Sequence, residues 1–547
     1  MVRKPAAAQP QDREAMAAAC LKEGARARAD RKGNEPTWRE AFDYVAPGRG
    51  AGIDGDDSYD AGTDQTRRAR VLSSVASEAA ENLASNLVGG VVPSNSRWFD
   101  LDVDGAGEAD KRWLSDVANF LWTNIHAANF DAEAFDAMLD MVCAGWFALY
   151  IGEAAEGGFQ FETWPMAQVS VRSSQPGGRV DTVFRHYKQS AEQAAKAYGF
   201  NALSERTQKL ITDGKGDTLV AFVHRIKPRT VWMPGAVMAK HWPIESLVVE
   251  EQAKHIVRES GYQEMPVVVP RWSRLPQSAY AVGPVCAALP DIRCLNRLRA
   301  NQLAATDLAV AGMWIAEDDG VLNPKTVKVG PRKIVVANSV DSMKPLLTGS
   351  DFNVGFMTED RLEAQIRKRL LADQLQAQDG PAMTAYEVHT RVALIRQLLG
   401  PIFGRMQAEF LQPLIDRCFG IAFRAGVLGA SPESLAGRNF HVKYISPMAR
   451  SQKLEEVTAI ERYGQFVSQQ MAQGFPEARD LIDSDEANRA VADGLGVPQR
   501  IVPDKKRVQA MRDARKQDQQ DQQQQAMQMQ GAASMTDAMA KRMAVAA

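Results

Sequence analysis

The pattern of apolar and polar positions predicts helices near both ends of the chain and strands in between. A charged, alanine-rich stretch over residues 12–46 predicts a surface helix, and apolar residues at near-helical spacing predict a second helix over 67–88. Gly89 and Gly90 follow directly and favour its end there. The Gly- and Asp-rich stretch 48–65 predicts a mobile loop between the two helices.

The next part of the chain predicts a mixed α/β module. Residues 97–101 favour an extended segment, and residues 109–151 contain two helical patterns, the second with Asn129 or Asp131 as its N-cap. The patterns that follow are strands over 159–187, a helix near 191–213, and further strands over 218–234 and near 245–251.

Two long helices with short strands between them are predicted in the second half. The first covers 281–311, and its regular part should begin at about residue 290, because Pro290 interrupts the first turns. The second covers 358–377. The stretch 312–352 between them predicts short strands joined by turns that contain Gly and Pro.

A third long helix is predicted after a break at 379–381. Thr384 and Glu387 form a capping box at its start, Pro413 should bend it, and Gly426 favours its end. The remaining patterns are a strand at 440–446, helices over 447–500, and beyond about residue 504 a Gln-rich tail too polar to form a core.

Composition favours several folded modules. At about 150 residues per domain, 547 residues correspond to three or four modules. Apolar residues make up 45% and charged residues 24%, as in ordinary globular proteins. The formal net charge of −2 lacks the basic surplus of proteins that grip DNA phosphates tightly. Tight wrapping of DNA is therefore not expected, whereas a near-neutral surface past which DNA slides remains open.

Cysteines and apolar runs bear on the compartment. The five cysteines are scattered, odd in number and without a CxxC, which fits a reducing cytoplasm and does not suggest a zinc ribbon. Cys143 and Cys418 lie in apolar stretches and are expected to be small buried hydrophobes. The first residues lack the apolar core of a signal peptide, and no run of about 18 apolar residues predicts a membrane span.

Motifs for catalysis are not found. The chain has no GxxxxGK[ST], strand-linked GxGxxG, HExxH or GxSxG sequence. His186 and His224 lie in strand-like runs and are expected to have structural roles. Acidic clusters at 54–57 and 317–319 lie in predicted turns without a partner His or Lys, so solvated loops explain them more simply than a metal-dependent nuclease site.

Five stretches, in order and spacing, resemble one known family. They are RARVLSSVASEAAENLASNLVGGVVPSNSRWFDLDV (68–103), NFDAEAFDAMLDMVCAGWFALYIGE (129–153), MPVVVPRWSRLPQSAYAVGPVCAALPDIRCLNRL (265–298), TAYEVHTRVALIRQLLGPIFGRMQAEFLQPLIDRCF (384–419) and VKYISPMARSQKLEE (442–456). Across roughly 70–460 the chain resembles the head-to-tail connector (portal) family of short-tailed phages, or podoviruses. It departs from the family at Tyr280-Ala281-Val282-Gly283, where Tyr-Gly is frequent before the helix.

The resemblance implies an α+β portal fold, assembled as a dodecameric ring around a channel. The implied regions are a wing (1–280), stem helix 1 (281–311), a strand-rich clip (312–355), stem helix 2 (356–375), a tunnel loop (376–383), the wing's long helix and strand (384–446), a helical crown (447–500) and a Gln-rich tail (501–547).

The resemblance also implies specific sites. The tunnel loop would line the DNA channel with Gln376, Ala377, Gln378, Asp379, Gly380, Pro381, Ala382 and Met383. Residues expected to pack stem helices between subunits are Leu295, Leu298, Leu303, Arg367, Lys368 and Arg369. The three basic residues lie among acidic ones, so charge pairs within the helix explain them as well as contacts to a neighbouring subunit do.

The implied role is passage of double-stranded DNA through a capsid vertex during packaging and ejection. Implied partners are further copies of the chain, the terminase motor, the major capsid protein, scaffold, and tail or adaptor proteins, in the virion and, during assembly, in the host cytoplasm. No catalytic site, metal, cofactor or membrane contact is implied. Two other interpretations stay open: another phage structural oligomer, without a strand-rich insert between two stem helices, and a metal-dependent nuclease, with clustered carboxylates.

Overall fold

The computed structural model describes residues 10–53, 61–103, 107–175, 177–311, 314–316, 343–345, 352–372, 400, 402–435, 441–444, 447–475, 477, 481–495, 497, 502–503 and 507–520. The chain divides into two compact units, residues 1–96 with 121–427, and residues 97–120 with 428–547. The predicted capping box at Thr384 and Glu387, the tunnel loop 376–383, most of the insert 312–355 and the acidic clusters lie outside the described residues.

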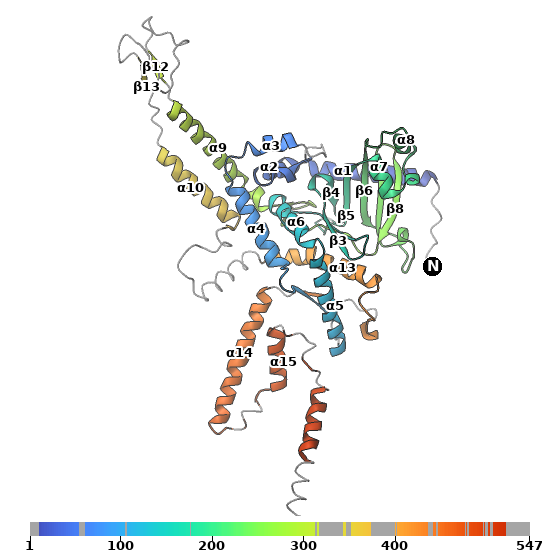
Figure 1. Ribbon diagram of the computed structural model, residues 1–547, viewed down its shortest axis with the longest axis vertical. Helices are drawn as coiled ribbons and strands as arrows, with labels where there is room; N and C mark the ends of the chain where they lie inside the picture. The colour runs from blue at the N-terminus through green and yellow to red at the C-terminus, as the bar shows by residue number, and fades with distance from the viewer. Residues whose placement is uncertain are drawn as a thin grey trace, which may run out of the picture. The chain divides into compact units, whose positions relative to one another are not determined.

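A five-stranded antiparallel sheet organises one part of the first unit. Its strand order is β4 (Val169–Arg172), β5 (Thr182–Ser190), β6 (Leu219–Pro228), β7 (Ile244–Glu250) and β8 (His255–Tyr262). Side chains alternate between its faces. Helix α1 (Pro10–Lys32) packs on one face, and α7 (Ala191–Tyr198) and α8 (Glu205–Thr212) cover part of the other (Figure 1).

The N-terminal region differs from the expected single surface helix. It forms two helices, α1 and α2 (Glu35–Val45), and a proline in the first turn of α2 marks the break. Ala17, Cys20 and Ala27 of α1 are fully buried against the sheet. The prediction of a surface helix was wrong because small residues produce no conspicuous apolar stripe, although they allow close packing.

Two other helix predictions also need correction. The helix expected over 67–88 is α4 (Val75–Val91), which a short helix α3 (Ala61–Arg68) precedes. Helix α4 continues through Gly89 and Gly90, because Leu87 and Val91 are buried and hold its last turn in place. The helix expected over 191–213 is divided into α7 and α8 at Gly199, whose φ of +90° interrupts helical geometry.

A second sheet, of three strands, lies beside helix α6 (Phe130–Ala144). Its order is β3 (Phe159–Thr163), β2 (Leu149–Glu153) and β9 (Val267–Val268). Asn129 lies at the N-cap position of α6 as expected, but its side chain makes no hydrogen bond to the helix. Its amide nitrogen donates to the Phe161 carbonyl, and its amide oxygen accepts from the Phe161 backbone N–H. Cys143 and Cys418 are fully buried, as predicted.

The second unit is built from two segments that are far apart in the sequence, and each contributes strand and helix residues. Strand β1 (Phe99–Asp102) pairs antiparallel with β14 (His441–Tyr444), which confirms both predicted extended segments. Helix α5 (Glu108–Ala127) contributes residues up to Phe120, and Asp110 on it accepts a hydrogen bond from Ser434. The remaining helices are α14 (Pro447–Ala472), α15 (Ser484–Leu495) and residues 507–520.

Acid is expected to destabilise the five-stranded sheet through His186. Burial and, to a smaller extent, the charges of Arg28 and Arg31 lower the pKa of His186 from 6.5 to about 4. The unfolded chain therefore takes up this proton first, so stability is fully present above pH 6.5 and is lost as the pH falls towards 4, by on the order of 3 kcal/mol. Thermal unfolding of His186→Gln should depend less on pH between 7 and 4 than that of the wild type. His255→Gln, a change at an exposed histidine, should leave the wild-type dependence intact, and equal slopes for all three proteins would contradict the assignment.

Candidate functional site

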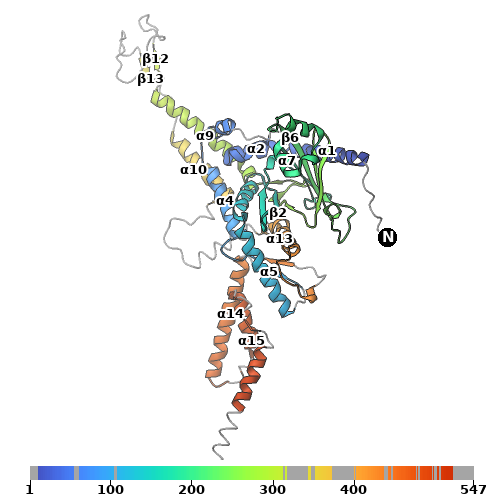
Figure 2. The ribbon, with the colours of Figure 1, turned by 45° about the vertical axis from the view of Figure 1, so that its right-hand side comes forward.

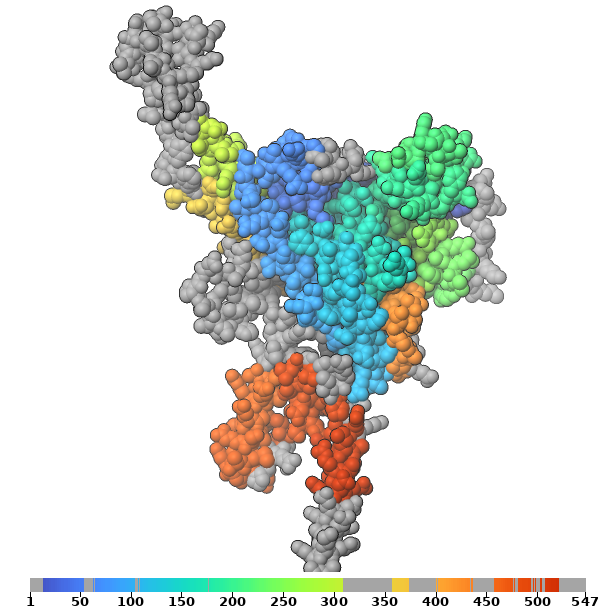
Figure 3. All heavy atoms as spheres, in the orientation of Figure 1, coloured from blue at the N-terminus to red at the C-terminus, as the bar shows by residue number. Residues whose placement is uncertain are grey.

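Two helices at the centre of the family resemblance lie side by side. These are α9 (Pro284–Ala311) and α10 (Phe352–Arg369), seen together in Figures 1 and 2. In Figure 3 their surfaces adjoin that of α4. Helix α9 is regular from Pro284 onward with Pro290 inside it, so the expected start near residue 290 was wrong. Helix α10 begins and ends earlier than predicted, and Leu371 beyond it has a positive φ of 59°.

A close approach of two backbones fixes the start of α9. A Cβ on Gly283 would lie 2.7 Å from both the Gly145 nitrogen and the Val142 carbonyl oxygen, so only glycine fits there. Gly145 ends α6 in the left-handed region with φ +92°. The Cys286 thiol also donates to the Cys143 carbonyl at 3.1 Å. Although this chain departs from the family's Tyr-Gly pattern, it still has a glycine, Gly283, at the position where the two backbone segments meet.

Three aromatic rings cover this junction. Trp38, Trp146 and Tyr280 pack with ring centroids 5.3–5.6 Å apart, in edge-on or tilted contacts. The buried Tyr280 hydroxyl accepts a hydrogen bond from the Val171 backbone at 3.2 Å. Helix α9 is thereby joined to α2, to the end of α6 and to the five-stranded sheet.

A buried ion pair connects the segment before α9 with the helical segment that leads into α13. Arg271 is 1% exposed, and its Nε and Nη2 donate to the two Glu409 oxygens at 3.0 and 2.6 Å. Glu409 lies in a π-helical turn, Gln407–Leu411, that leads into α13 (Gln412–Arg424). This turn stands directly before Pro413, where the sequence predicted a bend. Helix α13 ends before Gly426, as predicted.

Charged side chains join α9 to α10. Arg299 of α9 lies 2.5 Å from Glu359 and 2.9 Å from Glu363 of α10. Arg369 lies 2.8 Å from Asp291 of α9. Arg369 and Asp291 are both partly exposed, so this pair is worth at most about 1 kcal/mol. Glu359 is 8% exposed, so its charge is less screened by solvent and depends on Arg299. Together the pairs set the register of the two helices.

The residues expected to pack between subunits fall into different environments. Leu295 is 1% exposed and already belongs to the core of its own chain, whereas Leu298 is half-buried and Leu303 is 55% exposed. Arg369 pairs within the chain, as described above, and Arg367 lies 3.9 Å from Glu363 of its own helix. Lys368 is exposed and has no ion-pair partner within the described part of the chain.

The C-terminal part of α9 and the start of α10 form the outer half of the helix pair, and this half is exposed. Among described positions 300–307 of α9 none is buried. Met357 at the start of α10 is 75% exposed. Two large apolar side chains, Leu303 and Met357, thus face away from the core on helices whose other halves are firmly anchored. Contact with a neighbouring molecule would remove this apolar surface from water, which is favourable.

Sequence reasoning missed several residues on which this arrangement depends. Arg271 gives no apolar signal, and the only hint was its place between Pro270 and Trp272 in the family-like stretch. Asn296 was also missed: its side chain accepts from the Leu72 nitrogen and donates to the Arg70 carbonyl, which fastens the segment before α4 to α9.

The described residues were also searched for metal and membrane sites. They contain no group of three or more His, Cys, Asp or Glu side chains placed to hold a metal ion. Among the helices described, none combines the length and apolarity needed to span a bilayer.

Comparison with known proteins shows which family the chain belongs to. The "Portal protein" of Salmonella phage epsilon15 is 25% identical over 524 residues, covering 93% of this chain and 92% of the relative. The "Probable portal protein" of Bordetella phage BPP-1 is 24% identical and covers 92% of each. A chain from the virion of a native gene transfer agent particle matches with 13% identity and a TM-score of 0.34, covering 76% of this chain and 88% of that one. A model of the bacteriophage head to tail connecting proteins matches residues 17–502, and the chain belongs to this family.

Proposed function

We propose that this head-to-tail connector works as one subunit of a closed portal ring at a capsid vertex, through which double-stranded DNA is packaged and ejected. The observation that carries the proposal is the α9–α10 pair, which is anchored in its own subunit at one half and exposes Leu303 and Met357 at the other. A tilted helix pair repeated around an axis builds a tube. The named relatives from phages epsilon15 and BPP-1, a portal protein and a probable portal protein, support this assignment.

The subunit interface of such a ring is heterologous, because different surfaces of neighbouring copies meet and close on themselves. We place the exposed halves of α9 and α10 in this interface, with Leu303 and Met357 meeting the neighbouring subunit. Lys368, which is exposed near the anchored end of α10, would meet it as well. Leu298 would lie at its edge. Leu295 supports the interface only from within its own core. Twelve copies are the number that the family resemblance implies.

The proposed regions follow the chain in order. They are wing (1–280 and 384–446), stem (281–311 and 356–375), clip (312–355), tunnel loop (376–383), crown (447–500) and tail (501–547). The two compact units divide the chain at 96/97, 120/121 and 427/428, so residues 97–120 fold with the crown segment. We propose that the clip meets the terminase motor and later the tail or adaptor proteins, and that the wing meets the major capsid protein and scaffold. The chain itself would have no catalytic site, since DNA translocation is driven by the motor.

The tunnel loop provides a test that uses DNA movement. Residues 376–383 carry one charge, Asp379, and no basic side chain. Asp379→Lys would place a positive charge on the channel wall in every subunit, and each phosphate contact adds salt-dependent affinity. Packaging, measured as nuclease-protected DNA over time, should slow at low salt and recover as salt rises. Asp379→Asn is the control and should remain near the wild-type rate. Equal rates for Asp379→Lys and wild type at low salt would remove residues 376–383 from the channel wall.

The function itself is tested by deletion of the gene in the phage that encodes the chain. Without the protein, heads should contain no packaged DNA and carry no tails. Supplying the wild type in trans should restore filled, tailed particles, and supplying Leu303→Asp should not. Filled and tailed particles in the absence of the protein would contradict the proposal.

A further inference from the structure

A cavity of about 280 Å³ lies beside the five-stranded sheet, on the face opposite α1. This is close to the lower end of the volumes of ligand pockets, roughly 300–1,000 Å³. Strands β5 to β8 form its floor, and Tyr150, Glu162 and Trp164 from the region of β2 and β3 form its rim. Five of its lining side chains are tyrosine or tryptophan and two are arginine. The cavity belongs entirely to the first unit and plays no part in the α9–α10 pair.

The cavity lining carries an uncompensated positive charge. Arg185 is paired with Glu162 at 2.9 Å and lies over the Trp164 ring at 4.7 Å, so it is held in place. The Arg258 side chain is exposed to solvent and has no hydrogen-bond or ion-pair partner among the described residues. His224 adds no charge near neutral pH, because burial and the nearby charges of Arg185 and Arg258 lower its pKa to about 3. Two positive charges and one negative charge leave a net +1.

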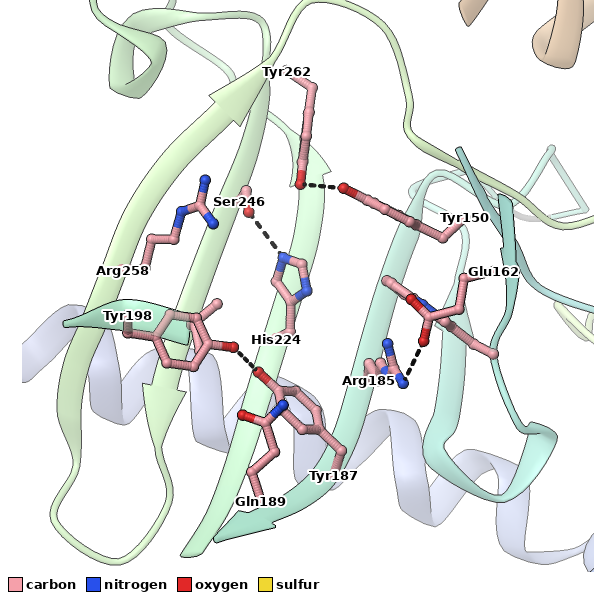
Figure 4. Close-up of a pocket in the computed structure, with 12 residues that line it drawn as sticks. Tyr150, Glu162, Arg185, Tyr187, Gln189, Tyr198, His224, Ser246, Arg258 and Tyr262 are labelled. Atoms are coloured by element: carbon pink, nitrogen blue, oxygen red, sulfur yellow. Dashed lines mark hydrogen bonds and ion pairs between the residues drawn. The ribbon is translucent and has the colours of Figure 1, made fainter. Parts of the chain in front are cut away.

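Arg258 lies within reach of both tyrosine pairs that border the cavity. Figure 4 shows it beside Ser246 and His224, with Tyr198 on one side and Tyr262 on the other. Electrostatics agree with this position. Burial raises the pKa of Tyr150 and of Tyr187, and in each case the charge of Arg258 partly opposes the rise.

The lining has hydrogen-bond donors that its own contacts leave unused. The Tyr150 and Tyr262 hydroxyls are 3.3 Å apart, and Tyr187 and Tyr198 form a second such pair. A pair of hydroxyls uses one proton for its own hydrogen bond, so each pair retains one proton to donate.

Two further polar atoms lack partners. Trp164 is 3% exposed, yet its Nε1 has no acceptor among the described residues. The Gln189 side-chain oxygen is a buried acceptor in the lining without a donor among the described residues. Buried polar groups without partners are costly, so a ligand that satisfies them gains affinity.

We propose that this cavity binds a nucleoside monophosphate. Its phosphate offers three acceptor oxygens to Arg258, the Trp164 N–H and the free tyrosine protons, more than a carboxylate offers. Its base is a flat ring of the kind that stacks on tyrosine, and the N–H groups of a base can donate to Gln189. An acidic aromatic peptide is the competing occupant, with two carboxylate oxygens in place of three.

The test is titration calorimetry of the purified, assembled protein with deoxyadenosine monophosphate. Saturable binding with a Kd below about 1 mM is expected. Deoxyadenosine, which lacks the phosphate, should bind at least about tenfold more weakly, the effect of losing charge-assisted hydrogen bonds. The same measurement with N-acetyl-aspartyl-tyrosine gives the competing occupant. Binding of this peptide without binding of the nucleotide would overturn the proposal.

Two variants locate the site. Arg258→Gln should weaken nucleotide binding at least about tenfold, while Arg206→Gln, at an exposed arginine of α8 outside the cavity, should leave it unchanged. Trp164→Phe keeps the ring and removes only the N–H donor, and it should weaken binding severalfold. Circular dichroism checks that the variants fold. Unchanged nucleotide binding by a folded Arg258→Gln protein would show that any binding occurs elsewhere and would overturn the assignment.

Discussion

Leu303→Asp is expected to leave the protein folded but unable to form rings. Leu303 is 55% exposed on the outer half of α9, so a charge there costs the isolated subunit little. In a ring, the same carboxylate would be buried against a neighbouring subunit without a partner, at a cost of several kcal/mol at each of the repeated interfaces. Mass photometry should show monomers where the wild type shows rings, and circular dichroism should be unchanged.

Two matched variants separate assembly from folding. Leu219→Asp makes the same change at a leucine that is 61% exposed on β6, outside the helix pair, and rings should still form. Leu295→Asp makes it at a position that is 1% exposed, and the subunit itself should fail to fold because a charge would enter its core. Normal rings from Leu303→Asp would remove this face of α9 from the subunit interface.

Arg271→Ala is expected to destabilise the subunit by about 3–5 kcal/mol. The change removes the partner of Glu409, which is 9% exposed, and leaves its carboxylate buried without a counter-charge. Stability should be measured by urea unfolding in the Leu303→Asp background, because assembly would otherwise add its own free energy to the result. Arg172→Met is the control. Its ion pair with Asp30 is exposed on both sides, so a loss of no more than about 1 kcal/mol is expected.

The double variant Arg271→Met/Glu409→Leu tests the physical reason. Two apolar side chains of similar volume leave no buried charge, and most of the stability lost in Arg271→Ala should return. A double variant as unstable as Arg271→Ala would mean that the shape of the pair, rather than the unpaired charge, causes the loss. A loss below about 1 kcal/mol for Arg271→Ala would contradict the buried ion pair itself.

The sequence predicted the elements whose side chains alternate or repeat clearly. Strands β5, β6 and β7 were expected because their apolar residues alternate, and α9 and α10 were expected from helical spacing with an insert between them. The boundaries were less accurate. Helix α4 passes Gly89 and Gly90, and α9 includes Pro290, because tertiary packing outweighs the local preference of one or two residues.

The periodicity of the sequence could not predict which residues contact each other in the folded chain. A helical pattern identified Leu295 and Leu303 as apolar, but it could not tell that the subunit's own core covers the first and leaves the second exposed. Likewise, nothing local predicts that Arg271 would meet Glu409, 138 positions later in the chain. The contact of Gly145 with Gly283 is equally non-local, since each glycine is required only by the backbone of the other segment.

The candidate site was therefore only partly predictable. The family resemblance directed attention to α9 and α10 and to the loop 376–383, whereas the division of α9 into an anchored and an exposed half came from the structure. The cavity beside Arg258 was not predicted at all. Its residues come from strands β5 to β8, from the end of α7 and from the segment 150–164, and nothing about any one of them alone marks a binding site.

Electron microscopy of the purified protein in negative stain tests the central claim most directly. Class averages viewed down the particle axis should show closed rings with a central hole and about twelve repeated subunits, as a heterologous interface that closes on itself requires. Monomers or compact dimers that persist across salt and protein concentrations would contradict a ring-forming portal subunit.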